Sequence, residues 1–317
     1  MKFHDLQLVS NKEMLLELDK SNLNSQNWLQ ENKENIENFI ATEGALLIRG
    51  LSISDGEEFG QTLKLLFGED LVNYTYRSTP RRKLSESNVY SATEYHASET
   101  IPQHNENAYS NSWPMRIGFL CMTPATKMGN TPISDSRVAY QEIPSEIREE
   151  FERKKIMYVR NYSEIDLPWE EVFQTDDKRM VEQFCKENSL EFEWTSNGLR
   201  TKQTNQATLL HPTTNEKLWF NQAHLFHSSS LGKEVEESLI DLVGEDFLPR
   251  NTFFGDGTPI DRESLDIIRT VFENTKFSFN WEKGDLLLLD NMLYTHGRQP
   301  YEGDRKILVG MARKYNK

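Results

Sequence analysis

Cysteine is scarce in this chain, since only Cys121 and Cys185 occur among 317 residues. They form no C-x-x-C pair, which excludes zinc-ribbon and thioredoxin-type sites. Basic residues are also outnumbered by acidic ones, so that the net charge is −14 and the sequence pI is about 5.1. Proteins that bind nucleic acids or anionic membranes need a basic face, so this composition argues against both classes. A small anionic ligand in a local basic pocket remains compatible with it.

Long apolar runs are missing as well. The first residues, MKFHDLQLVSNKEMLL, contain no uninterrupted apolar stretch of the kind that signal peptides have. No segment approaches the roughly 18 apolar residues of a membrane-spanning helix. The sequence also has no Gly/Ser linker, no internal repeat and no low-complexity tract. We therefore expect a cytoplasmic protein in a reducing environment, folded as a single domain over residues 1–317.

Hydrophobic residues make up 37% of the chain and aromatic residues 11%, enough for a sizeable core. Apolar spacing and charged helix-forming segments predict helices over 27–44, 55–68, 145–155, 168–189, 233–247 and 259–274. Short apolar or alternating segments predict strands at 45–50, 113–125 and 156–162, within 190–229, and in 276–291 and 305–315. This pattern favours an α+β, mainly β, fold: a double-stranded β-helix (jelly-roll) core with N-terminal helices and helical insertions.

The segment IPQHNENAYS places a histidine, His104, two residues before a carboxylate, Glu106. On an extended segment, residues i and i+2 lie on the same face, so both side chains could reach one metal ion. An H-x-E triplet often arises by chance, however. A third ligand is needed before the pair predicts a metal site.

The third ligand has to come from the remaining histidines, which are His4, His96, His211, His224, His227 and His296. His296 has the most favourable context, because it lies in a short polar segment just beyond the apolar run Leu286–Leu289, which is typical of a strand buried on both faces. Two histidines and one carboxylate on a β scaffold match the facial triad of non-haem Fe(II) oxygenases, which leaves three coordination positions open. His224 and His227 could instead form an i,i+3 pair on a helical turn, or simply make hydrogen bonds at a strand-to-helix junction.

Arg305 begins the strand-like segment that follows His296. A guanidinium group offers a two-pronged donor that matches a carboxylate, so Arg305 is a candidate for holding an acidic ligand near the metal. The alternative is a surface ion pair with Glu302 or Asp304.

These residues occur in segments that resemble the TauD/TfdA family of Fe(II)/2-oxoglutarate-dependent oxygenases. The resemblance is carried by ALLIRGL, TEYHASETIPQHNE, GNTPISDSR, LWFNQAHLFH and THGRQPYEGDRKILVGMAR. It implies that His104, Glu106 and His296 bind Fe(II), and that Arg305 and Thr131 bind the far carboxylate of the cosubstrate 2-oxoglutarate. It also implies a reaction with O2 that yields succinate, CO2 and a hydroxylated product.

The sequence of these segments is similar to the natural-product branch of this family, which is associated with nonribosomal peptides. Its members hydroxylate amino-acid units, some of them tethered to a carrier protein. Retention of a carboxylate at Glu106 favours hydroxylation over halogenation, while desaturation and cyclisation stay open.

Two positions depart from the family pattern. Met128 replaces the first glycine of the segment that contains Thr131. Val309 stands where several members carry a second arginine, which binds an acidic group of a free substrate. The difference at Val309 favours a substrate without a free acid, such as a carrier-bound aminoacyl thioester. Another basic residue could substitute for the missing arginine, and the candidates are Arg77, Arg81, Arg82 and Arg200.

Two other classes of function remain open from the sequence. One is a non-catalytic jelly-roll module that binds a metal, in which Arg305 would have no ligand. The other is a different metalloenzyme, such as a hydrolase, that uses His224 and His227.

Overall fold

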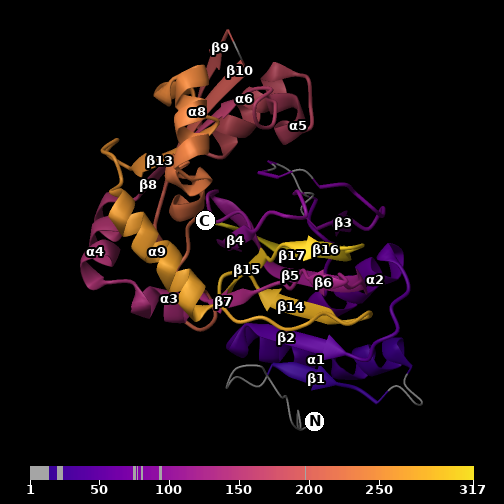
Figure 1. The fold of residues 1–317 in the computed structure, drawn as a ribbon. Coiled ribbons are helices and arrows are strands. Elements are labelled where there is room, and N and C mark those ends of the chain that lie inside the picture. Colours follow the sequence, from indigo (N-terminus) through magenta and orange to yellow (C-terminus); the bar gives the residue numbers. More distant parts are fainter. Residues whose placement is uncertain are drawn as a thin grey trace.

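The computed structural model describes residues 14–19, 24–73, 76, 78, 79, 81–92, 95–196 and 198–317. Its central feature is a six-stranded sheet with the order β1-β2-β14-β5-β17-β3 (Figure 1). These strands are β1 (Leu15–Glu17), β2 (Ala45–Arg49), β14 (Leu286–Asp290), β5 (Ser112–Thr123), β17 (Lys306–Asn316) and β3 (Tyr90–Ser91). His4 and Arg77, two of the residues considered from the sequence, lie outside the described part of the chain.

The apolar run of β14 shows why this sheet is buried on both faces. Leu286 and Leu288 pack on one side, in the same cluster as helices α1 (Ser25–Glu43) and α2 (Gly56–Phe67). Leu287 and Leu289 pack on the other side, in a second apolar cluster. Successive side chains of a strand point to opposite faces, so an unbroken apolar run requires cover on both. The predicted strands at 45–50 and 113–125, and the first two predicted helices, are confirmed.

A three-stranded sheet lies on the face opposite the two helices. Its order is β4-β15-β7, with β4 (Ile101–His104), β15 (Tyr294–Arg298) and β7 (Ile133–Asp135). Ile133 and Tyr294 from this sheet belong to the same apolar cluster as Leu287 and Leu289. A short pair, β16 (Tyr301–Glu302) with β6 (Lys127–Met128), continues at its end. Two β layers around a shared core, antiparallel except for the pair β1–β2, correspond to the predicted jelly roll.

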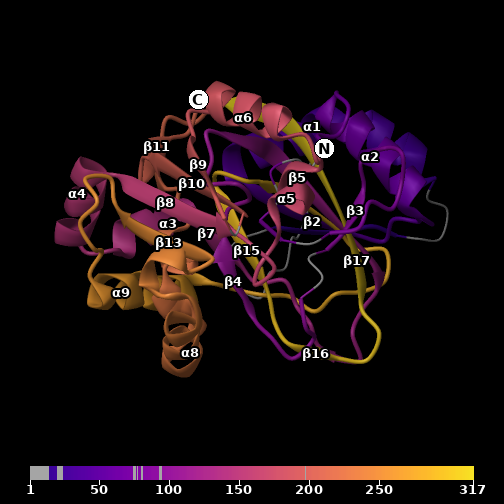
Figure 2. The same cartoon turned by 90° about the horizontal axis from the view of Figure 1, so that it is seen from above.

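The middle of the chain forms a second region, which contains the four-stranded sheet β13-β8-β10-β9 and several helices. Figure 1 shows this sheet far from α1 and α2, and Figure 2 shows the same arrangement from above. Its strands are β8 (Ile156–Tyr162), β9 (Glu191–Thr195), β10 (Gly198–Asn205) and β13 (Arg250–Phe254); β11 (Thr208–Leu210) pairs with β12 (Lys217–Trp219). The helices of this region are α3 (Ser136–Glu142), α4 (Ser145–Lys154), α5 (Trp169–Phe173), α6 (Lys178–Glu187), α7 (Ala223–Phe226), η2 (Ser228–Leu231), α8 (Lys233–Val243), η3 (Glu245–Phe247) and α9 (Arg262–Thr275).

Three sequence predictions need correction. Helix α3 lies before Pro144, where no helix was predicted. Asp135 caps its first turn by accepting the N–H of Arg137. The predicted helix 168–189 is two helices, since Gln174 adopts a left-handed conformation and Asp177 caps a new start. His296, predicted to lie in a short polar segment beyond the apolar run, is part of a further strand, β15.

No helix in the described part of the chain is both long and apolar enough to cross a membrane.

His224 lies in the short helix α7 and His227 between α7 and η2, and hydrogen bonds hold both side chains in place. Nε2 of His224 lies 3.0 Å from the carbonyl oxygen of Gln103, and its ring packs against Phe272 in a tilted arrangement with centroids 4.9 Å apart. Nδ1 of His227 accepts the backbone N–H of Ser229 at 3.1 Å. Burial lowers the pKa of each imidazole to about 4. Both rings are therefore neutral in the folded protein at neutral pH.

The buried His224 predicts a measurable pH dependence of stability. An unfolded histidine titrates near 6.5, so the folded state is favoured fully above that pH and loses this contribution as the pH falls from about 6.5 to about 4. The loss amounts to roughly 3 kcal/mol. We expect His224→Gln to flatten this part of the pH profile in urea unfolding, whereas His96→Gln, in an exposed loop, keeps the parent slope. Equal slopes for all three proteins would show that His224 is not neutral in the fold.

Candidate active site

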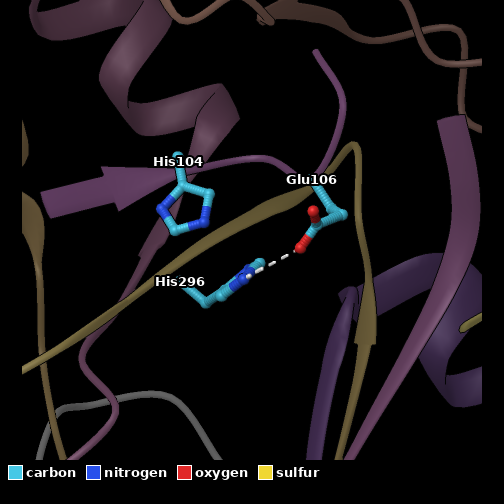
Figure 3. A group of neighbouring side chains, drawn as sticks. All are labelled: His104, Glu106 and His296. Atoms are coloured by element: carbon cyan, nitrogen blue, oxygen red, sulfur yellow. Dashed lines mark ion pairs between the residues drawn. The ribbon is translucent and has the colours of Figure 1, made fainter. Parts of the chain in front are cut away.

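The pairing of two strands brings the predicted histidines together. In the antiparallel pair β15–β4, His296 stands directly opposite His104, and their ring centroids lie 4.5 Å apart. Glu106 joins them from the segment after β4, with its Oε2 3.8 Å from Nε2 of His296 (Figure 3). One ligand atom from each of the three side chains lies within 4.8 Å of the other two. Among the described residues, this is the one cluster of three such side chains that could hold a metal ion.

Glu106 reaches this cluster in a different way from the one expected. Strand β4 ends at His104, and Glu106 lies in the turn that follows, so the two side chains do not share a face of one strand. The backbone of Glu106 is instead held by the side chain of Asn291, which accepts its N–H at 2.7 Å and donates to its carbonyl at 2.9 Å. The expected i,i+2 geometry was therefore wrong, although the proximity it predicted is present.

The protonation of the two histidines suits metal binding. Nδ1 of His104 lies 2.8 Å from the carbonyl oxygen of Pro102, which can only accept, so Nδ1 carries the proton and Nε2 keeps its lone pair. Burial lowers the pKa of His104, and burial together with the nearby His104 and Arg81 holds the pKa of His296 well below its usual range. Two neutral imidazoles and a carboxylate are a donor set that fits a divalent transition metal.

Arg81 contributes a contact that the sequence did not reveal. Its Nη2 donates to Oε2 of Glu106 at 2.6 Å, and both side chains are only 3% exposed. A charge-assisted hydrogen bond of this kind fixes the carboxylate strongly. Arg82, by contrast, is exposed, and Arg200 lies on β10 in the other sheet. Of the four arginines considered as substitutes at Val309, Arg81 is the one that lines the pocket among the described residues.

A pocket extends from the two histidines toward Arg305 and Thr131. It has a volume of about 410 Å³, including the part open to solvent. Its lining residues are Arg81, Ala92, Ile101, His104, Phe119, Thr131, His296, Gly297, Arg298, Arg305 and Ile307. The two histidines predicted for a metal and the two residues predicted for an acidic ligand thus line one cavity, and Glu106 lies beside the histidines.

Arg305 is fixed at the far end of this pocket. Its Nε donates to the carbonyl of Gly129 at 2.8 Å and its Nη2 to Oγ1 of Thr131 at 3.3 Å. Burial and the neighbouring Arg298 lower the pKa of Arg305 to about 10, which leaves it a cation at neutral pH. Glu302, one of the alternative partners for Arg305, pairs with Lys127 at 2.7 Å.

Met128, which replaces a glycine of the family pattern, does not disturb Thr131. Its φ is 56°, a left-handed value that glycine adopts more easily. Its side chain is 63% exposed and points away from the core. Met128 therefore adopts a backbone conformation that suits glycine, with its side chain in solvent.

The remaining histidines considered from the sequence do not join a second metal cluster among the described residues. His211 is buried, with Nε2 3.1 Å from Oδ2 of Asp290 and Nδ1 accepting the N–H of Thr214 at 3.1 Å. His224 and His227 make the hydrogen bonds given above, which fits the structural role that the sequence left open for them.

Comparison with known proteins identifies the family of this chain. The model of the family "Taurine catabolism dioxygenase TauD, TfdA family" matches residues 11–312. Over 278 residues, the chain is 41% identical to the dapdiamide synthesis protein DdaC of Enterobacter agglomerans, covering 87% of this chain and 84% of that protein.

Solved structures show the same fold. PvcB of Pseudomonas aeruginosa matches with a TM-score of 0.55 and 15% identity, over 94% of this chain and 84% of that one. An asparagine oxygenase, solved with Fe(II), a hydroxyasparagine and succinate, matches with a TM-score of 0.53 and 14% identity, over 90% of this chain and 79% of that one. These likenesses confirm the predicted jelly-roll architecture. The chain belongs to the TauD/TfdA family, and it is therefore, as its sequence predicted, an Fe(II)/2-oxoglutarate-dependent dioxygenase.

Proposed function

We propose that this enzyme hydroxylates an unactivated C–H bond of an amino-acid-derived substrate in natural-product biosynthesis. The observation that carries the proposal is a pocket with two imidazoles at one end, next to which the Glu106 carboxylate lies, and the partly buried guanidinium of Arg305 at the other end. The likeness to a dapdiamide synthesis protein supports the natural-product setting. The fold of an asparagine oxygenase, solved with a hydroxyasparagine, supports an amino-acid-like substrate.

In this proposal His104, Glu106 and His296 hold the Fe(II). Nε2 of His104 is directed away from the Pro102 carbonyl, and Oε2 of Glu106 and Nε2 of His296 lie 3.8 Å apart. A facial triad leaves three coordination positions for cosubstrate and O2. When bound, iron and 2-oxoglutarate supply an oxidant strong enough for an unactivated C–H bond, and the protein supplies orientation and a dry site.

Arg305 and Thr131 bind the far carboxylate of 2-oxoglutarate. The guanidinium provides charge and a directional donor inside a buried pocket, where such a hydrogen bond is strong. Oγ1 of Thr131 already accepts hydrogen bonds from Nε1 of Trp281 at 3.1 Å and from Arg305 at 3.3 Å. Its own O–H proton is therefore free to be donated to the carboxylate.

The substrate is proposed to be an aminoacyl unit that a carrier protein presents as a thioester. Val309, at the position of the second family arginine, is only 1% exposed and packs in the apolar core. This position therefore offers no cation to a free acid. Hydroxylation is the proposed outcome because Glu106 keeps the carboxylate ligand, with desaturation or cyclisation as the alternatives. The cytoplasmic location and the single-domain organisation remain predictions from the sequence.

A mass-spectrometric screen tests this function. Purified enzyme with Fe(II), 2-oxoglutarate and O2 is incubated with free amino acids, carrier-bound aminoacyl units and short peptides. We expect one class, the carrier-bound one, to gain a single oxygen atom with matching release of succinate. A product that loses two hydrogens would indicate desaturation or cyclisation instead. Succinate release with no substrate modified, or no succinate at all, would contradict the proposed hydroxylase.

Replacing single ligands tests the metal assignment. His296→Ala and Glu106→Ala should each lose most of the bound iron and all product formation, because two of the three donors cannot hold the ion. His224→Ala should keep the parent iron content, since its ring serves the Gln103 carbonyl. Iron per chain, measured by inductively coupled plasma spectrometry, decides the matter. The opposite pattern, with iron lost at His224 and kept at His296, would favour the hydrolase alternative.

Arg305→Gln tests the cosubstrate assignment. Losing a buried charge-assisted hydrogen bond costs about 1.5–3 kcal/mol, so the KM for 2-oxoglutarate should rise by roughly 10- to 100-fold. Iron content should stay at the parent value. Lys127→Gln is the matched control, because this exposed cation lies nearby but pairs with Glu302. An unchanged KM in Arg305→Gln would remove this residue from the cosubstrate site.

A further inference from the structure

The position of Glu106 is not explained by strand pairing, because β4 ends at His104. A ligand on a turn needs another constraint if its carboxylate is to stay close to His296. The side chain of Asn291 makes two hydrogen bonds with the backbone of Glu106: its Oδ1 accepts the N–H, and its Nδ2 donates to the carbonyl oxygen. In an antiparallel sheet, a pair of residues exchanges the same two bonds. Asn291 therefore takes the place of a missing strand partner.

The amide of Asn291 is itself fully constrained. Its Oδ1 accepts from Glu106 at 2.7 Å, and its Nδ2 donates to Glu106 at 2.9 Å and to the carbonyl of Pro114 at 2.8 Å. The residue is 0% exposed. Because Pro114 belongs to β5, this amide ties the ligand turn to the main sheet.

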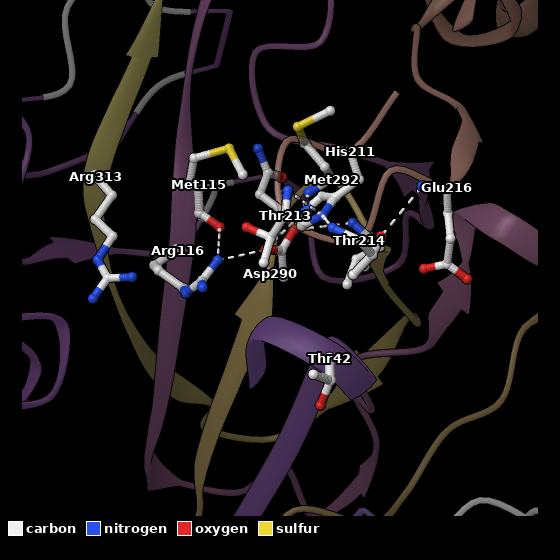
Figure 4. A network of polar contacts seen from close by, with 12 residues as sticks. Thr42, Met115, Arg116, His211, Thr213, Thr214, Glu216, Asp290, Met292 and Arg313 are labelled. Carbon is white, nitrogen blue, oxygen red and sulfur yellow. Dashed lines mark hydrogen bonds and ion pairs between the residues drawn. The ribbon is translucent and has the colours of Figure 1, made fainter. Parts of the chain in front are cut away.

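The turn that carries Asn291 is held by a buried charged network (Figure 4). Oδ1 of Asp290 accepts the N–H of Met292 at 2.9 Å and of Leu293 at 3.1 Å. Its Oδ2 pairs with Arg116 and lies 3.1 Å from Nε2 of His211. A buried carboxylate with this many partners fixes the turn between β14 and β15. Asn291 is thus presented by a rigid support.

The same turn also holds the residue between the two ligands. Nδ2 of Asn105 donates to the backbone carbonyl of Asn291 at 2.6 Å, and Gln222 donates to the carbonyl of Asn105 at 2.5 Å. Beyond the turn the chain enters β15, which carries His296. One turn therefore controls where the second and third ligands stand relative to each other.

We propose that Asn291 is a positioning residue for the metal ligand Glu106, which its side-chain amide holds at the correct distance from His296. The proposal rests on the metal site of the proposed function. Partners that orient metal ligands typically change metal affinity by roughly 10- to 100-fold when they are removed. The side chain of Asn291 makes its hydrogen bonds to backbone groups of Glu106 and Pro114, so we expect its effect on the metal to act through Glu106.

The test is the dissociation constant for Mn(II), used as a redox-stable probe and followed by the electron paramagnetic resonance signal of the free ion. On the full chain, Asn291→Ala should weaken Mn(II) binding by roughly 10- to 100-fold. The matched control is Asn251→Ala, at a buried amide on β13 that accepts the backbone N–H groups of Ser228 and Thr252. This control should lose stability, measured by thermal unfolding, but bind Mn(II) within about twofold of the parent protein.

Asn291→Ser, which keeps a small polar group in the same space, should weaken Mn(II) binding to the same extent. It replaces Asn291→Ala as the test if that variant does not fold. Folded Asn291 variants with parent Mn(II) affinity would overturn the proposal, and so would an equal loss of affinity in Asn251→Ala. Failure of the proposed function has a different signature. In that case the parent protein itself would not bind Mn(II), or His296→Ala would bind it as tightly as the parent.

Discussion

The site depends on the register in which β15 pairs with β4. His296 stands opposite His104 on one side of β15 and opposite Ile133 of β7 on the other. A shift of one residue would turn every side chain of β15 to the opposite face, and the imidazole of His296 would leave the pocket. The central place of β15 in its sheet, with a partner on each edge, makes such a shift costly. The position of the candidate metal-binding side chains therefore depends first on the backbone pairing of β15 with β4.

Charge is distributed unevenly between the whole chain and the pocket. The chain has a net charge of −14, yet three arginines line the pocket: Arg81, Arg298 and Arg305. Among the described lining residues there is no carboxylate. Arg298 donates to the backbone carbonyls of Tyr95, His96 and Glu99, which holds the loop 95–99 beside the cavity. This local excess of positive charge suits a dianion such as 2-oxoglutarate in an otherwise acidic protein.

The sequence predicted the parts of the site that local pattern determines. The apolar run before His296 indicated a strand buried on both faces, and β14 has that environment. The resemblance of short motifs indicated Thr131 and Arg305, which lie within hydrogen-bond distance of each other. Helices and strands with a clear local apolar pattern were predicted for the same reason. Helix α3 and the break before α6 were missed, because their signals are the single residues Asp135 and Asp177.

Contacts between distant segments could not be predicted in this way. Arg81 and Glu106 are 25 positions apart, and Glu106 and Asn291 are 185 positions apart. Neither Arg81 nor Asn291 belongs to a pattern that spacing reveals, because one lies in a loop and the other in a turn. Both make hydrogen bonds with Glu106, the proposed metal ligand whose expected strand geometry was wrong. The residues that hold a ligand in place thus became visible only when the fold had placed them beside it.

The most direct test of the account is an anomalous diffraction map from crystals grown with Mn(II) and without O2. We expect one strong peak bonded to Nε2 of His104, Nε2 of His296 and a carboxylate oxygen of Glu106, at roughly 2.0–2.2 Å from each. A peak between His224 and His227, or a metal bound without His296, would contradict the central claim that these three side chains share one ion.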